Sequence, residues 1–297
     1  MPDKSESVLF KTILFTVLAL VAFASNSVLC RFALGEKTIG AANFTTIRLL
    51  SGAIVLFLIL QIRNRGKRSS SKGSWFSAAM LFLYAASFSF AFLTLDVGTG
   101  ALILFGSVQV TIILLSLFFG NRLHLTEWIG VVVAFAGFAY LVSPHVSTPS
   151  MSGFILMMIG GIGWGVYTLR GRGSSNPLAD TSFNFARTIP FVITLFAVTY
   201  HPSDISTKGL ILAIISGGIS SGIGYTIWYR ALRNLTDTQS AVVQLAVPVI
   251  AAIGGVIFVS ESISLRLIIS TIFILGGILT VILGKYYYVI LKQTSNT

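Results

Sequence analysis

Residues 99–119 read TGALILFGSVQVTIILLSLFF and contain no charged side chain. A helix of this length, rising about 1.5 Å per residue, spans the roughly 30 Å hydrocarbon core of a bilayer. The run is continuously apolar, whereas the strands of an outer-membrane barrel alternate between apolar and polar residues. The stretch therefore predicts a transmembrane α-helix.

Nine further stretches have the same character and end at charged residues, Gly, Pro or Asn. The first one, with Lys4 and Lys11 before it and Ala22-Phe23-Ala24 within it, also resembles a signal peptide. Its apolar run continues to Leu34, however, which favours a first transmembrane helix. The connections are too short for a soluble domain, so the predicted fold is an all-α polytopic membrane protein of ten transmembrane helices. The predicted spans are 12–31, 41–61, 75–95, 99–119, 124–142, 152–170, 180–200, 209–230, 239–259 and 267–288.

The composition agrees with burial in lipid. Of the 297 residues, 55% are apolar and 10% are charged, against roughly 25% charged in a soluble domain. The net charge of +11 could suggest nucleic acid, but the basic residues lie in short gaps between apolar stretches, where they set membrane orientation. We therefore expect a lipid bilayer as partner and no nucleic acid. The single cysteine, Cys30, is predicted to be a small core residue.

The distribution of Lys and Arg predicts the orientation. The loop between the second and third spans carries five basic residues and is expected to be cytoplasmic. With ten spans, both termini are then cytoplasmic, and the protein is a multi-pass protein of the inner or plasma membrane. The inside basic residues are Lys4, Lys11, Arg63, Arg65, Lys67, Arg68, Lys72, Arg122, Arg170, Arg172, Arg230, Arg233, Lys285 and Lys292, against Arg31, Lys37, Lys208 and Arg266 outside.

An internal repeat is predicted from matching positions in the two halves. Arg31 and Arg48 fall on Arg170 and Arg187 at an offset of 139, and Gly137 falls on Gly277 at an offset of 140. Each half contains five spans, an odd number, so the halves must be inverted relative to one another. Inverted repeats around a site near the midplane are a recurring design of secondary transporters. The predicted halves are residues 1–147 and 148–297.

The chain resembles the drug/metabolite transporter (DMT) superfamily and, within it, the ten-helix EamA-type exporters. The resemblance rests on Ala24–Arg31 (ASNSVLCR), Gly163–Arg170 (GWGVYTLR), the two second-helix arginines, Ala241–Pro248 and the Ser260-Glu261 turn. Two positions depart from the family pattern. Gly120-Asn121 lacks the glutamate of the first-half turn, and Ser25-Asn26 stands where Trp-Gly is common.

The resemblance implies a function. Proteins of this kind are secondary transporters, and this chain is expected to export small metabolites, amino acids or related compounds, by alternating access around a central cavity. It is expected to be a monomer or a homodimer. The resemblance does not identify the substrate.

Arg48 and Arg187 are the strongest candidates for residues of the substrate site. An arginine at the centre of a membrane helix costs roughly 2.5–3.5 kcal/mol on insertion scales, so it normally faces a protein interior or an aqueous cavity. They could attract a carboxylate or phosphate of the solute. Alternatively, they could reach the interface or bond to backbone carbonyls at a helix end.

Polar and aromatic residues within the spans are further candidates for the substrate pathway. The amides could instead bond across helices, and aromatic residues at helix ends could belong to the interfacial belt, which is the interpretation favoured for Trp228 and Tyr229. With the two arginines, the predicted pathway residues are Asn26, Arg48, Tyr84, Gln109, Trp164, Tyr167, Asn184, Arg187, Tyr225 and Gln244.

Other functions have less support. The chain contains no P-loop for ATP, and its histidines (His124, His145 and His201) lie in separate loops. No catalytic constellation, metal-ligand cluster or cofactor motif is apparent, so we expect neither an enzyme nor a cofactor. The nine carboxylates lie near span ends or in the tail, which argues against simple carboxylate-based ion coupling. A membrane-embedded enzyme and a channel remain the alternatives.

Overall fold

The computed structural model describes residues 4–64, 72–118, 125–143, 149–171, 174–199, 205–235 and 243–294. All regular structure within these ranges is helical. Several residues used above lie outside the described ranges, among them Arg65, Lys67, Arg68, Gly120, Asn121, Arg122, Arg172, Ala241 and the three histidines.

Helical structure occurs in each of the ten predicted spans, which confirms the all-α polytopic prediction. In the described part of the chain, six helices are long and apolar enough to cross a membrane, and shorter apolar helices occupy the other spans. The first half contains α1 (Lys4–Gly35), α2 (Ala41–Asn64), α3 (Trp75–Ala91), α4 (Val97–Phe118) and α5 (Leu125–Val142). The second half contains α6 (Met151–Gly171), α7 (Pro177–Arg187), α8 (Ile189–Val198), α9 (Thr207–Ile214), η1 (Ile215–Ile223), α10 (Gly224–Leu232), α12 (Val247–Val259) and α13 (Leu265–Thr294).

Two predicted spans end or break earlier than expected. The third span was predicted to reach residue 95, but α3 ends at Ala91 and a turn follows. The seventh span is divided at Thr188 into α7 and α8, with Pro190 in the first turn of α8. Proline lacks an N–H and its ring interferes with the preceding turn, which explains the break.

The eighth span contains a π-helical segment, η1, between α9 and α10. Its sequence, ISGGISSGI, is rich in small residues, and Gly217 lies directly against the backbone carbonyl of Arg48 in α2. Because no side chain separates them, α2 and η1 approach closely. Single π-helical turns often occur at functional sites, and this segment supplies several serines to the centre of the bundle.

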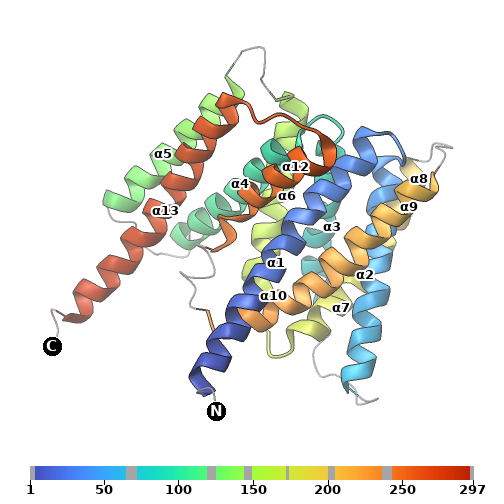
Figure 1. Ribbon diagram of the computed structural model, residues 1–297. Helices are drawn as coiled ribbons and strands as arrows, with labels where there is room; N and C mark the ends of the chain where they lie inside the picture. Colours follow the sequence, from blue (N-terminus) through green and yellow to red (C-terminus); the bar gives the residue numbers. More distant parts are fainter. Residues whose placement is uncertain are drawn as a thin grey trace.

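The helices form one bundle and a pair that packs against the bundle through α4 (Figure 1). In the bundle, α6 packs on α3 and α4, α1 packs on α10 and α12, and α2 packs on η1 and α7. The pair consists of α5 and α13, which lie side by side where Gly130 and Gly277 each contact the partner helix backbone. Large apolar side chains on the outside, such as Val132 (63% exposed) and Ile272 (65% exposed), suit a lipid environment.

We call the two ends of the bundle the Glu261 end and the Lys72 end. The Glu261 end contains the C-terminus of α1 and the turn from α12 to α13. The Lys72 end contains the start of α3, the end of α6 and the end of α10. Helix α1 begins and α13 ends at this second end (Figure 1).

Candidate solute site at the centre of the bundle

Arg48 is a buried cation in the first third of α2, with 1% of its surface exposed. Its NH2 group donates a hydrogen bond to the Tyr84 hydroxyl at 2.8 Å, and its Nε donates to Ser221 Oγ at 3.4 Å. The NH1 group is buried without a hydrogen-bond partner. Among the described residues no carboxylate forms an ion pair with Arg48. A buried charge without a counter-charge is unfavourable, so an anion bound beside Arg48 would stabilise it.

Aromatic rings surround the guanidinium and the space beside it. The Arg48 Cζ atom lies 4.9 Å from the centroid of the Phe88 ring and 5.2 Å from that of Tyr84, within the range of cation–π attraction. The Trp164 ring lies 5.0 Å from Tyr84 and 4.9 Å from Tyr225. We call this group the aromatic cluster; its members are Phe23, Tyr84, Phe88, Trp164 and Tyr225.

Helices from both halves bring the aromatic cluster together. Phe23 comes from α1, Tyr84 and Phe88 come from α3, and Trp164 and Tyr225 come from α6 and α10. They enclose a cavity of about 10 Å³ that is also lined by Asn26, Leu104 and Phe105, so a solute would enter it only as these rings move apart. The Oδ1 atom of Asn26 accepts a hydrogen bond from Ser216 Oγ of η1 at 2.8 Å.

Two larger cavities lie between this cluster and the Lys72 end. One, of about 290 Å³, is lined by Trp164 and Tyr225 on its inner side and by Arg233 and Gln244 farther out. Because Trp164 and Tyr225 also line the central cavity, they separate the two spaces. The other cavity, of about 450 Å³, is lined by Lys72, Ser77, Tyr167, Arg170, Asp180 and Asn184 among others. The Lys72 end therefore has hollow, basic approaches to the aromatic cluster.

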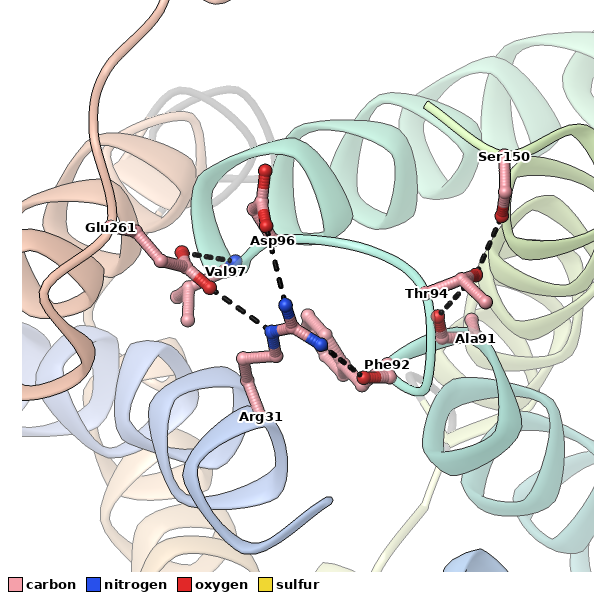
Figure 2. A network of polar contacts seen from close by, with 8 residues as sticks. All are labelled: Arg31, Ala91, Phe92, Thr94, Asp96, Val97, Ser150 and Glu261. Carbon is pink, nitrogen blue, oxygen red and sulfur yellow. Dashed lines mark hydrogen bonds and ion pairs between the residues drawn. The ribbon is translucent and has the colours of Figure 1, made fainter. Parts of the chain in front are cut away.

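A polar network links the helices at the Glu261 end (Figure 2). Arg31, near the end of α1, donates from Nε to Glu261 Oε1 at 3.1 Å and lies 3.4 Å from Asp96 Oδ1. The other carboxylate oxygen of Glu261 accepts a hydrogen bond from the Val97 N–H at 2.7 Å. Burial raises the pKa of the Glu261 carboxyl, with the Asp96 charge adding to the effect and the bonds from Val97 and Arg31 opposing it. The network joins α1, α4 and the turn after α12.

A backbone turn positions Glu261 in this network. Ser260 ends α12 in the left-handed conformation, with a φ of 57°, and the Glu261 N–H donates to the Gly255 carbonyl at 3.2 Å. This conformation turns the chain so that the Glu261 side chain reaches the first residue of α4. A second link at the same end joins Ser150 Oγ to Thr94 Oγ1 at 2.6 Å (Figure 2).

Comparison with known proteins assigns the family. A model described as the EamA-like transporter family matches residues 10–143 and again residues 151–283. The chain belongs to this family. It is thus a membrane transporter of the DMT superfamily, as its sequence resemblance indicated.

Individual relatives of this EamA-family chain agree with that assignment. It is 45% identical over 278 residues to an uncharacterized protein of Pseudomonas aeruginosa, with 94% of each chain covered. It is 29% identical over 265 residues to an uncharacterized transporter of Archaeoglobus fulgidus, which covers 82% of this chain and 87% of that one. A protein solved by crystallography shares the fold, with a TM-score of 0.62 at 15% identity over 90% of this chain and 94% of the other.

The structure brings six of the ten predicted pathway residues together. Asn26, Tyr84, Trp164 and Tyr225 line the central cavity, and Arg48 bonds to Tyr84. The Tyr167 ring stacks on Trp164 with 5.5 Å between centroids. All six are at least nine-tenths buried.

The other four predicted residues lie elsewhere in the EamA-family fold. Arg187, at the end of α7, donates to the Lys72 carbonyl oxygen, and its Cζ atom lies 5.7 Å from the Trp75 ring. Asn184 accepts a hydrogen bond from the Ser74 N–H at 2.9 Å, which anchors the start of α3. Gln244 lines the 290 Å³ cavity, and Gln109 is buried in α4 outside the cavity linings.

Sequence reasoning missed Phe23, Phe88 and the serines of η1. Nothing distinguishes these two phenylalanines from the other 21 in the sequence, since their role depends on which helices face each other. The run of small residues from Ile215 to Gly224 was the available signal for η1. Trp228 was assigned to the interfacial belt, and this was wrong: it is 4% exposed, and its ring lies 5.6 Å from Phe23.

No metal site is evident in the part of the chain that the structure describes, because no three His, Cys, Asp or Glu side chains lie close enough there to hold an ion. The chemistry that the site offers is recognition by charge, hydrogen bonds and aromatic surface.

Proposed function

We propose that this EamA-family chain is a secondary transporter that exports small metabolites, amino acids or related compounds among them, across the inner or plasma membrane. The observation that carries the proposal is Arg48, a buried guanidinium with one unpartnered nitrogen beside a cavity that both halves line. A solute carboxylate at this position would supply the missing counter-charge. A buried charge within a membrane-spanning helix normally marks a solute pathway.

The halves, residues 1–147 and 148–297, are proposed to be inverted repeats. The helix contacts support this symmetry. In the predicted repeat, α1 corresponds to α6, α3 to the helix formed by α9, η1 and α10, and α4 to α12. The contact of α3 with α6 then matches that of α10 and η1 with α1, and the contact of α4 with α6 matches that of α12 with α1. The counterparts α4 and α12 contact each other, as do α5 and α13. Rocking of such halves around a shared site would give alternating access.

The Lys72 end is proposed to face the cytoplasm, with both termini on that side. The excess of Lys and Arg at this end supports the orientation. A cavity of about 250 Å³ also lies at the Glu261 end, but the 290 Å³ cavity at the Lys72 end is the one that shares Trp164 and Tyr225 with the central cavity, which supports loading of solute from inside. Loading from inside is consistent with export.

Counterflow in proteoliposomes tests the proposal. Vesicles are preloaded in turn with pooled amino acids, nucleosides or phosphorylated sugars, and uptake of labelled solute is followed. Saturable exchange of an unmodified solute is expected with one of these pools. Chemical conversion of the solute would favour an enzyme, and non-saturating flux without counterflow would favour a channel.

Two arginine variants test the site. Arg48→Ala is expected to reduce transport far more than it reduces the amount of folded protein. Arg187→Ala, which removes the bond to the Lys72 carbonyl instead, should reduce transport only as far as it reduces folded protein. Parallel loss of transport and protein in Arg48→Ala would contradict a binding role for this residue.

A further inference from the structure

The carboxylates whose side chains the structure describes all lie away from the aromatic cluster. Asp96 and Glu261 bond to Arg31, and Glu36 forms an ion pair with Lys208. Asp180 accepts hydrogen bonds from the Gly73 N–H and from Ser174 Oγ. Glu127 is buried in α5, where it lies near Gly284 of α13. The central site is therefore built without an acidic side chain from the described ranges.

The approach to the site is basic. Lys72 and Arg170 line one of the two larger cavities and Arg233 lines the other. Among the described residues that line these two cavities, one is acidic, Asp180. Both of its carboxylate oxygens already accept hydrogen bonds. A cleft lined by one sign of charge concentrates ions of the opposite sign. The approach therefore favours anions over cations.

The central site offers donors for an anion but little for an ammonium group. Arg48 NH1 is an unpartnered charged donor, whereas the Asn26 Oδ1 acceptor is already bonded to Ser216. An ammonium group would find ring faces and neutral hydroxyl oxygens such as that of Tyr84, but no carboxylate among the described residues, and the nearby guanidinium would repel it. The body of the solute would contact Phe23, Trp164 and Tyr225, which suits an apolar, planar group.

We propose that the central site selects organic anions, with a carboxylate that binds Arg48 and an apolar, planar body that packs in the aromatic cluster, over zwitterions and cations with the same body. This selectivity rests on the proposed transport function and narrows it. It distinguishes solutes of net negative charge from amino acids, which carry a compensating ammonium group.

Three probes with the same indole ring test the selectivity by calorimetric titration of the purified full-length chain in detergent. Indole-3-propionate is an anion, tryptophan adds an ammonium group to it, and tryptamine is tryptophan without the carboxylate. Indole-3-propionate is expected to bind at least about tenfold more tightly than tryptophan, because the ammonium group of tryptophan would be buried near the guanidinium without a counter-charge. Tryptamine is expected to bind most weakly.

A matched pair of variants assigns the selectivity to one arginine. Arg48→Gln should weaken indole-3-propionate binding by about tenfold or more and remove its preference over tryptophan. Arg187→Gln, the sequence counterpart outside the cluster, should leave both affinities unchanged. Equal weakening by both variants would overturn the assignment to Arg48. If Arg48→Gln does not fold, the ranking of the three probes on the unaltered protein still decides the proposal.

The results separate this inference from the broader function. Tryptophan binding as tightly as indole-3-propionate, or no binding of indole-3-propionate, would overturn the anion selectivity. If counterflow of amino acids were found in either case, the transporter function would stand and only the anion selectivity would be wrong. Binding of indole-3-propionate without counterflow in vesicles preloaded with indole-3-propionate would support the anion site while contradicting transport.

Discussion

Arg31 Nε lies 3.1 Å from Glu261 Oε1, and this ion pair joins α1 in the first half of the chain to the turn after α12 in the second (Figure 2). Glu261 also accepts the Val97 N–H, so one side chain of the second half holds two elements of the first. Arg170, the sequence counterpart of Arg31, is exposed and lies over the Phe76 ring. The two ends of the bundle are thus held together by different contacts.

Glu261→Ala is expected to open the Glu261 end. The variant removes the partner of Arg31 and leaves the Val97 N–H without its acceptor, and bonds of this charged kind contribute about 1.5–3 kcal/mol each. Cys30, the single cysteine of the chain and 0% exposed next to Arg31, reports the change. A hydrophilic maleimide at fixed pH should label it at least about tenfold faster in the variant.

Glu36→Ala is the matched control. Glu36 pairs with Lys208 at the same end, but both side chains are more than two-fifths exposed, and exposed pairs contribute little. Labelling of Cys30 in this variant should match that of the unaltered protein. Faster labelling in both variants, or in neither, would show that the Glu261 contacts do not hold this end closed.

The Glu261 contacts also predict a pH dependence. Burial raises the pKa of this carboxyl above its ordinary value, despite the bonds from Val97 and Arg31. The closed arrangement therefore holds the proton more tightly than a hydrated carboxyl does. By linkage, the closed arrangement is favoured below the raised pKa and loses this contribution as the pH rises through it. The transition should lie above the usual range of a glutamate.

Spin labels at Lys37 and Ser262, both exposed at this end, measure the effect in a Cys30→Ala background. Pulsed dipolar distance distributions should shift toward longer separations as the pH is raised. Arg31 and Asp96 are the other charged side chains of this network. Glu261→Gln should remove the pH dependence; persistence of the shift in this variant would assign it to another group.

Gly217→Ala is expected to destabilise the contact between α2 and η1. A methyl group here would overlap the Arg48 carbonyl oxygen and Ser51 Oγ, and overpacking of this kind typically costs about 1–3 kcal/mol. The midpoint of thermal unfolding in detergent should fall accordingly. Gly276→Ala is the control, because a methyl group on Gly276 meets no atom within 4 Å and alanine favours a helix over glycine by about 0.5–1 kcal/mol. An equal fall in both variants would contradict the packing argument.

Much of this fold could be predicted from the sequence because membrane spans are read from apolar length alone. The difference between Arg48 and Arg187 was harder to predict, since both occupy the same position of the predicted repeat. Pro190, three residues after Arg187, was the available sign that this arginine ends a helix. The position of Phe88 and the π-helical geometry of η1 depend on contacts between distant segments, which the spacing of residues in one chain does not encode.

Tyr84→Phe isolates the contribution of one hydroxyl to the solute site. The ring remains under the guanidinium, but Arg48 NH2 loses the acceptor that it contacts at 2.8 Å. Leaving this buried, charged donor unpaired is expected to lower the free energy of unfolding by roughly 1–3 kcal/mol, measured by thermal unfolding in detergent. Because the variant has a second unpaired nitrogen on Arg48, added indole-3-propionate should raise its unfolding temperature more than that of the unaltered protein.

Tyr140→Phe provides the comparison for Tyr84→Phe. The Arg266 Cζ atom lies 5.5 Å from the Tyr140 ring, but Arg266 donates its hydrogen bonds to the Leu141 and Ser143 carbonyl oxygens instead. Removing the Tyr140 hydroxyl, on a ring that is 41% exposed, should change neither stability nor the response to indole-3-propionate. If the two variants behaved alike, the bond from Arg48 to Tyr84 would have no special weight. Because both tyrosines lie beside an arginine, a difference between them isolates the effect of a buried donor that lacks its acceptor.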